Sequence, residues 1–316
     1  MSSDGFDDDY RRASEWIRQL GSGNAADARP GIDTASLVAR FPELASVSVD
    51  DLELTGPQAP VPARRYLAPH PRAGLVWVHG GGFVAGDLDM PESHWVSLAL
   101  AAAGISVVAL DYRKALNGVR YPTPLDDVLA GWREVRRRTG ELGLPDAPLF
   151  FGGASAGASL AAGATVRLRA SGQSSDLPAG LVLIYPLLHP TPPAPDKALA
   201  GALAALPPES RIPPGFARRL NENLFGPTPN ATDPAAYPAL AALEGFPPLL
   251  VVNADSDDLR PSGEDFAVLA QRAGVPAEVA CETGTVHGYL DHPGSPGAVR
   301  TLARIGRWVL GGDAQA

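Results

Sequence analysis

Short, continuously apolar segments alternate with longer helix-like segments along most of this chain. The apolar runs occupy residues 74–78, 105–110, 149–151, 181–185 and 249–252. Strands that are apolar throughout are buried on both faces, which is typical of a parallel sheet covered by helices. The pattern therefore predicts an α/β fold whose functional groups lie at the carboxyl ends of the strands.

Further strands are expected before and after these runs. Residues 47–54 alternate apolar and polar side chains and can pair with residues 61–67 across Gly56-Pro57, which predicts an antiparallel pair at a sheet edge. A last strand is expected at residues 277–281, followed by a closing helix at residues 298–310. With 316 residues, the chain is long enough for one core that carries an elaboration.

The alternation of strand-like and helix-like segments is interrupted from residue 186 to residue 248. It is rich in Pro and Ala and has no strand pattern, with short helices expected at residues 197–205 and 215–223. Its apolar side chains, such as Phe216 and Leu220, favour a packed lid over a disordered insert.

The N-terminal segment is expected to fold over the functional site together with this lid. Residues 14–20 have the spacing of a short amphipathic helix, and residues 21–33 have the composition of a flexible connection. The predicted organisation is an N-terminal arm (residues 1–45) that contributes to the cap, a core (46–186 and 248–316) and a cap insertion (187–247).

A Gly-Ala-Ser-Ala-Gly sequence at residues 153–157 lies between a strand-like run and a helix-like run of small residues. In this setting Gly-x-Ser-x-Gly is the sequence form of a nucleophile elbow, a turn that admits only very small flanking side chains. Its central residue, Ser155, is the candidate nucleophile. A serine hydroxyl reacts at neutral pH only with a base within hydrogen-bond reach and a carboxylate that orients the base.

Candidates for both partners follow later strands. Asp255, Asp257 and Asp258 come directly after the run at residues 249–252, and His287 follows the strand expected at residues 277–281. The carboxyl ends of parallel strands share one edge of the sheet, so these loops are expected near the elbow. Any of the three carboxylates could also be a solvated surface group.

Three consecutive glycines, in His-Gly-Gly-Gly-Phe at residues 79–83, follow the buried run at residues 74–78. Such a stretch leaves backbone N–H groups unobstructed, as an anion-binding loop requires. An ordinary glycine-rich turn has the same composition, and the downstream elbow favours the anion-binding interpretation. His79, which opens the motif, is expected to brace the loop.

Together these motifs resemble the hormone-sensitive-lipase-like, or bacterial family IV, branch of the α/β-hydrolases. They occur in that family's order over roughly residues 75–290, and the glycine loop joined to the elbow is their most specific part. The motifs are His-Gly-Gly-Gly-Phe (79–83) with Gly-Asp (86–87), Asp-Tyr-Arg (111–113), Gly-Ala-Ser-Ala-Gly (153–157), Asp-Asp-Leu-Arg (257–260) and His-Gly-Tyr (287–289). The resemblance implies the α/β-hydrolase fold, with about eight mostly parallel strands, flanking helices and a helical cap.

The resemblance also implies a role for each candidate residue. Ser155 is expected to be the nucleophile, His287 the general base and then acid, and Asp257 the carboxylate that fixes the imidazole. Asp257 is chosen because it stands two residues before the Leu-Arg pair at 259–260, as in the family pattern.

An oxyanion hole is expected from the backbone N–H groups of Gly81, Gly82 and Ala156. The implied function is a serine carboxylesterase that hydrolyses short to medium acyl esters through an acyl-enzyme, with a small-molecule ester as its partner. The family further implies a homodimer formed through residues 277–310. An amide hydrolase or deacetylase of a small metabolite would use the same triad, and a non-catalytic ligand-binding protein on this fold is a more distant alternative.

This chain departs from the family pattern at two places. Ala154 replaces a commonly acidic residue, and Ala158 replaces the second glycine after the elbow, although both keep the turn's side chains small. The segment after Asp-Tyr-Arg usually continues Leu-Ala-Pro-Glu, whereas here it reads Lys-Ala-Leu-Asn at residues 114–117. The second change alters the local pocket wall without touching the triad.

Composition excludes several other classes. The formal net charge of -9 and the lack of Lys/Arg clusters outside one helix argue against nucleic-acid or anionic-membrane partners. A cytoplasmic protein without stable membrane insertion is expected, because no secretory signal or apolar run of about 18 residues is visible. Cys281 is the only cysteine, and no pair of His, Asp or Glu at ligand spacing has a second such pair nearby, so no metal and no cofactor are expected.

Overall fold

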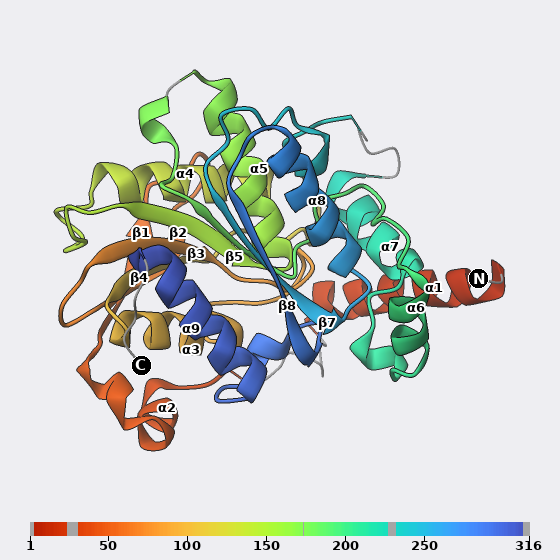
Figure 1. Ribbon diagram of the computed structural model, residues 1–316, viewed down its shortest axis with the longest axis horizontal. Coiled ribbons are helices and arrows are strands. Elements are labelled where there is room, and N and C mark those ends of the chain that lie inside the picture. Colours follow the sequence, from red (N-terminus) through yellow and green to blue (C-terminus); the bar gives the residue numbers. More distant parts are fainter. Residues whose placement is uncertain (1–2, 24–30, 173, 227–231, 312–316) are drawn as a thin grey trace.

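A central twisted sheet with helices on both faces forms the body of the protein (Figure 1). The computed structural model describes residues 3–23, 31–172, 174–226 and 232–311. The sheet has the strand order β1-β2-β4-β3-β5-β6-β7-β8. These strands are β1 (Ser48–Leu54), β2 (Val61–Leu67), β3 (Ala73–Val78), β4 (Ile105–Leu110), β5 (Leu149–Ala154), β6 (Leu181–Ile184), β7 (Leu249–Ser256) and β8 (Ala277–Val286).

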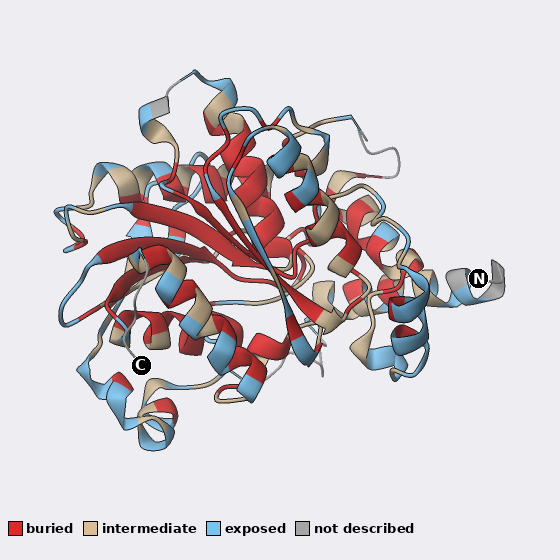
Figure 2. Cartoon of the chain, in the orientation of Figure 1, coloured by how far each residue is buried: buried red, intermediate tan, exposed pale blue. Residues whose placement is uncertain are grey.

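Strand direction agrees with the sequence-based predictions. β1 pairs with β2 and β2 with β4 in antiparallel fashion, and every later neighbouring pair is parallel. The predicted antiparallel pair at a sheet edge is therefore confirmed. All residues of β3, β4, β5 and β6 are buried, as their continuously apolar sequences require (Figure 2).

Helices cover both faces of this sheet. In Figure 1, α4, α5 and α8 lie on one side, and α3 and α9 lie on the other. The helices of the described residues are α1 (Ser3–Gly21), α2 (Thr34–Arg40), α3 (Pro91–Ala102), α4 (Thr123–Arg137), α5 (Ala156–Ala170), α6 (Lys197–Ala204), α7 (Pro214–Phe225), α8 (Arg260–Arg272) and α9 (Pro296–Leu310).

A separate hydrophobic core fills each face of the sheet. On one face Trp132 of α4 stacks on Phe151 of β5, with ring centroids 4.7 Å apart. On the other face Trp308 of α9 meets Phe150, the preceding residue of β5, edge-on at 5.4 Å. Two successive side chains of β5, which point to opposite faces of the sheet, thus contact the two helix layers.

Two element boundaries differ from the predictions, and one helix was not predicted. The N-terminal helix begins at Ser3 instead of residue 14, because the acidic residues at its start are favourable near a helix N-terminus. The last strand continues past residue 281 to Val286, beyond an irregularity opposite Ala254 and Ser256. Helix α2 was not predicted and begins directly after the flexible connection expected at residues 21–33; residues 24–30 of that connection are outside the described residues.

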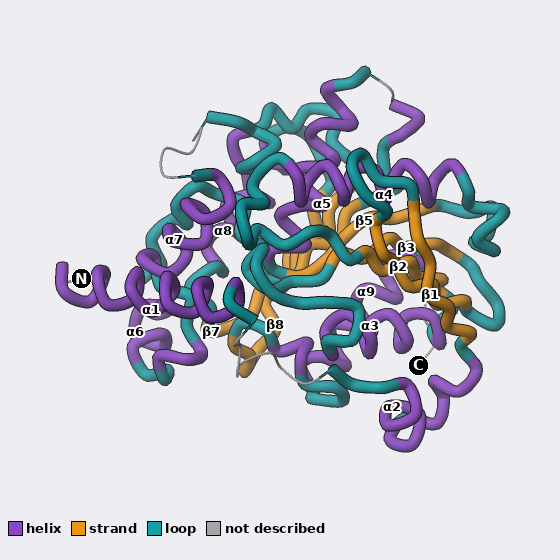
Figure 3. The backbone as a smooth tube through the Cα atoms, turned by 180° about the vertical axis from the view of Figure 1, so that it is seen from behind, coloured by secondary structure: helices purple, strands orange, loops and turns teal. Residues whose placement is uncertain are grey.

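Helix α1 packs against α7, as Figures 1 and 3 both show. Trp16 of α1 and Phe216 of α7 bring their ring centroids to 5.8 Å. The N-terminal segment therefore lies beside the segment expected to form the lid, although about 200 positions separate the two in sequence. Among the described helices, none is both long and apolar enough to cross a membrane.

Candidate active site

Ser155 occupies a strained turn between β5 and α5. Its φ and ψ angles are 51° and -119°, a conformation that side-chain-bearing residues seldom adopt. A Cβ at Gly153 or at Gly157 would overlap the carbonyl oxygen of Val78 on the neighbouring strand. The turn therefore requires glycine on either side of the serine, which is the physical content of the elbow motif.

His287 and Asp257 complete a hydrogen-bonded relay with this serine. The Nε2 atom of His287 lies 3.0 Å from Ser155 Oγ, and its Nδ1 atom lies 2.8 Å from Asp257 Oδ2. A carboxylate can only accept hydrogen bonds, so the Nδ1 atom of His287 carries the proton. The Nε2 atom is then free to accept a hydrogen bond from the Ser155 hydroxyl. The structure thus brings the three side chains predicted from the sequence together in the geometry of a triad.

The neighbouring carboxylates of this loop have other partners. Asp258 accepts hydrogen bonds from the Arg211 guanidinium at 2.7 and 3.0 Å, and Asp255 accepts one from the Gly284 N–H group at 2.9 Å. Asp257 is buried and also accepts a bond from the Leu259 N–H group. Of the three candidates, only Asp257 faces the histidine.

Tyr185 packs against the imidazole ring of His287. It follows β6 with a φ of 36°, is buried, and places its ring centroid 4.8 Å from that of His287. Sequence reasoning missed this residue, and its only signal was its position at the end of a buried strand.

The glycine loop after β3 turns back on itself beside the elbow. Gly81 and Gly82 have φ angles of 106° and 60°, and a Cβ at Gly81 would overlap the carbonyl group of Ala85. Within the described residues, neither the Gly81 nor the Gly82 N–H group has a hydrogen-bond acceptor. The N–H group of Ala156 is likewise free of an intrahelical acceptor, since it opens α5.

Gly80, at the start of this loop, is fixed through both of its backbone polar groups. Its N–H group donates to Glu92 Oε2 at 2.8 Å, and its carbonyl oxygen accepts from His79 Nδ1 at 2.8 Å and from the Tyr112 hydroxyl at 3.3 Å. The Gly80 carbonyl and the Gly81 N–H group share one planar peptide unit and point in opposite directions. Holding the carbonyl therefore aims the Gly81 N–H group, and the expectation that His79 braces the loop is confirmed.

Glu92 is a buried acid that sequence reasoning did not single out. Besides the Gly80 N–H group it accepts a hydrogen bond from Trp77 Nε1 at 2.8 Å. Burial, and then the charge of Asp291, raise the pKa of Glu92 to about 8, against the lowering effect of its two donors. The sequence offered little signal, because an acidic residue in the first turn of a helix is usually a solvated group.

Apolar side chains from the cap side lie above the glycine loop. A Cβ placed on Gly82 would lie 3.1 Å from Leu220 of α7 and 3.6 Å from Trp16 of α1. The roof over this part of the site is therefore shared by the N-terminal helix and α7.

The remaining histidines lie away from the triad. His94 is buried between the Tyr66 hydroxyl at 2.7 Å and the Thr34 hydroxyl at 3.0 Å. His189 contacts Ser262 and Asp265 at 2.8 and 3.0 Å. No group of three or more His, Cys, Asp or Glu side chains in the described part of the chain is arranged to hold a metal ion.

Comparison with known proteins gives a consistent class. Residues 75–291 match the family model for the alpha/beta hydrolase fold. Esterase LipI of Mycobacterium tuberculosis is 31% identical over 267 residues, which are 81% of this chain and 79% of that relative. Ethyl acetate hydrolase of Pseudomonas putida is 30% identical over 250 residues, 77% of this chain and 76% of that one.

Solved structures share the fold. The structure of brefeldin A esterase, described as a bacterial homologue of human hormone sensitive lipase, has a TM-score of 0.76 and 22% identity, covering 95% of this chain and 85% of that chain. The chain therefore belongs to the alpha/beta hydrolase fold family. Its predicted place in the hormone-sensitive-lipase-like branch is confirmed.

Proposed function

We propose that this protein is a serine carboxylesterase that hydrolyses short to medium acyl esters. The observation that carries the proposal is the relay from Ser155 Oγ through His287 to Asp257, at 3.0 and 2.8 Å, beside a loop whose Gly81 and Gly82 N–H groups have no acceptor among the described residues. The esterase and ethyl acetate hydrolase activities named for the two sequence relatives support the same reaction and a short acyl group.

The geometry accounts for both halves of the reaction. His287 Nε2 takes the hydroxyl proton as Ser155 Oγ attacks the ester carbonyl, and the imidazolium is stabilised by Asp257. The same proton then passes to the leaving alcohol, which produces an acyl-enzyme. Water activated by His287 attacks this ester, and the carboxylic acid leaves as Ser155 regains its proton.

We assign the oxyanion hole to the N–H groups of Gly81, Gly82 and Ala156. Their lack of acceptors among the described residues leaves them available to a developing negative charge. Preorganised donors of this kind lower the barrier because they need no reorientation during the reaction.

We further propose the division into an N-terminal arm (residues 1–45), a core (46–186 and 248–316) and a cap (187–247). The contact of α1 with α7 and the position of Trp16 and Leu220 above Gly82 support it. In this division, the arm and the cap together shape the acyl pocket. A cytoplasmic location and a homodimer remain predictions.

Replacing the nucleophile tests the proposal directly. We expect Ser155→Ala to abolish turnover of p-nitrophenyl acetate and p-nitrophenyl butyrate, and to abolish covalent labelling by a fluorophosphonate. The matched control is Ser46→Ala, because Ser46 is exposed and distant in sequence from Ser155. This variant should retain both the turnover and the labelling. Turnover at the wild-type rate in Ser155→Ala would contradict the assignment.

A further inference from the structure

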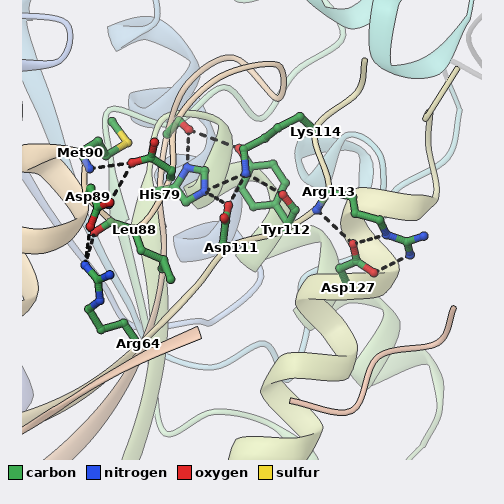
Figure 4. Close-up of polar contacts among 12 residues, drawn as sticks. Arg64, His79, Leu88, Asp89, Met90, Asp111, Tyr112, Arg113, Lys114 and Asp127 are labelled. Atoms are coloured by element: carbon green, nitrogen blue, oxygen red, sulfur yellow. Dashed lines mark hydrogen bonds and ion pairs between the residues drawn. The ribbon is translucent and has the colours of Figure 1, made fainter. Parts of the chain in front are cut away.

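Lys114 places its ammonium group in a half-buried cluster with His79, Asp111 and Tyr112, next to the glycine loop (Figure 4). Its Nζ atom contacts three acceptors: Asp111 Oδ1, the Tyr112 carbonyl oxygen at 2.6 Å and His79 Nε2 at 3.2 Å. The ammonium also lies 4.4 Å from the centroid of the Tyr112 ring. All three N–H donors of the lysine are thus used, although the proposed mechanism assigns this side chain no role.

His79 is the acceptor that connects Lys114 to the active site. Its Nδ1 atom faces the Gly80 carbonyl at 2.8 Å, so this nitrogen must carry a proton to form a hydrogen bond. Its Nε2 atom faces two groups of opposite character, Asp111 Oδ1 at 3.1 Å and Lys114 Nζ at 3.2 Å. The ring stacks on Tyr112 at 4.7 Å, which limits its rotation.

Two acceptors therefore compete for the single proton of a neutral His79. A hydrogen bond to the Asp111 carboxylate is charge-assisted and stronger than one to the neutral Gly80 carbonyl. With Asp111 as the only neighbour of Nε2, the proton would move to Nε2. The Nδ1 lone pair would then face the Gly80 oxygen and repel it.

We propose that Lys114 is a positioning residue that selects the His79 tautomer with its proton on Nδ1. The ammonium pairs with Asp111 and donates to Nε2, so Nε2 is an acceptor and the proton stays on the side of Gly80. Through the Gly80–Gly81 peptide this tautomer aims the Gly81 N–H group. That last step rests on the proposed function, because it treats this N–H group as an oxyanion donor.

The charges around the cluster agree with a neutral His79. Burial, and then the positive charge of Lys114, lower the pKa of His79, against the raising effect of Asp111. Burial also lowers the pKa of Lys114, whereas Asp111 raises it. The charged and titratable groups that face Lys114 are His79, Asp111 and Tyr112 in contact, with Asp87 and Asp127 contributing through their charges.

The tautomer itself can be observed by ¹⁵N NMR of histidine-labelled protein, with the His79 signals assigned by their loss in His79→Gln. In the wild type we expect Nδ1 to be protonated and Nε2 to be unprotonated from pH 6 to pH 9. In Lys114→Met, which keeps an unbranched side chain, Nε2 should be protonated over this range. A protonated Nε2 in the wild type, or an unprotonated one in Lys114→Met, would overturn the proposal.

The double variant Asp111→Asn/Lys114→Met is the matched control. It removes both charges together, and the amide of the introduced asparagine can donate to Nε2 as the ammonium does. We expect this variant to return the proton to Nδ1. A protonated Nε2 in the double variant would show that the choice does not depend on these two groups, and would also overturn the proposal.

Kinetics test the link to the oxyanion hole. At pH 8 to 9 we expect Lys114→Met to lower kcat for p-nitrophenyl acetate about tenfold with KM within about twofold, because an oxyanion donor acts in the transition state. The double variant should recover to within about threefold of the wild type. An unchanged kcat in Lys114→Met with a switched tautomer would overturn this link. An inactive wild type with the expected tautomer would instead contradict the esterase proposal.

Discussion

At the scale of single residues, this site depends on groups that hold the peptide backbone as much as on the triad. Glu92 accepts from the Gly80 N–H group and from Trp77 Nε1, and it has about 2% of its surface exposed. Its carboxyl group therefore links the glycine loop, at Gly80, to Trp77 of β3. A buried acid that receives two donors is sensitive both to substitution and to pH.

Glu92→Gln should destabilise the protein and change its pH dependence. The amide NH₂ group would face one of the two N–H donors, and the unsatisfied group should cost about 1–3 kcal/mol. The folded-state pKa of Glu92 is raised to about 8 from 4.5, so the folded wild type keeps a proton that the unfolded chain loses in this window. Wild-type stability should therefore fall as pH rises from about 4.5 to about 8, by up to about 1.4 kcal/mol per pH unit from this group.

Urea unfolding between pH 5 and pH 9 measures this effect. The stability of the wild type relative to Glu92→Gln should fall up to about pH 8, far enough to cancel or reverse the cost of the substitution, and then stay constant. Glu43→Gln, an exposed glutamate in the turn Pro42–Ser46, should follow the wild type throughout. Parallel pH curves for the wild type and Glu92→Gln would contradict the raised pKa.

Sequence patterns predict the site residues that belong to a recognisable motif. They miss the residues whose role depends only on contacts made in the folded structure. Ser155, Asp257 and His287 were predicted because their loops have recognisable patterns in a fixed order. Glu92 and Lys114 act through groups that the fold brings to them from other strands, and no local pattern marks such contacts. Lys114 was noticed only as a departure from the family sequence.

At the scale of elements, the buried strands were the easiest to predict. β3, β4, β5 and β6 are apolar on both faces, whereas the edge strand β8 is mostly exposed or half-buried and its polar second half was missed. α1 was predicted too short because its first turns are mostly polar and acidic, and only Phe6 and Tyr10 there continue the apolar spacing of Ala13 and Ile17. Its partner α7 supplies the contact that the isolated segment lacks.

Trp16 of α1 should influence acyl-chain preference. Its ring lies beside Phe216 and above Gly82, so Trp16→Ala opens space over the glycine loop. We expect the ratio of kcat/KM for p-nitrophenyl octanoate to that for the acetate to rise at least about fivefold, since each methylene in an apolar pocket is worth about 1–3 kcal/mol. Trp308→Ala, on the far face of the sheet against Phe150, should lower stability without changing this ratio. An unchanged ratio in Trp16→Ala would place the acyl pocket elsewhere.

At the scale of the whole molecule, an ion pair connects the proposed cap to the core next to the triad. Arg211 donates from two nitrogens to Asp258, which also accepts from the Ile212 N–H group at 3.0 Å. The Asp258 side chain is only 7% exposed, and it directly follows Asp257 in sequence. Arg12 of α1 donates to the Pro208 carbonyl, so arm, cap and core are joined within one region.

Breaking this pair should loosen the cap. Arg211→Met leaves the Asp258 carboxylate buried with one remaining donor, which should cost about 3 kcal/mol of stability. Hydrogen exchange in α6 and α7 should accelerate relative to that in α5. Arg211→Met/Asp258→Asn removes the uncompensated charge and should restore most of the loss. Equal stability of the single and double variants would show that the charge pair has no such role.

The contact between Trp16 and Phe216 also sets the order in which the site can be completed during synthesis. The ribosome makes Trp16 some 200 residues before Phe216, which at about 5–20 residues per second is an interval of roughly 10–40 s. During this interval the apolar face of α1 cannot pack against α7, and the glycine loop is not yet covered by the side chains of α7. A nascent chain of this protein is therefore expected to expose the apolar face of α1 until α7 has been translated.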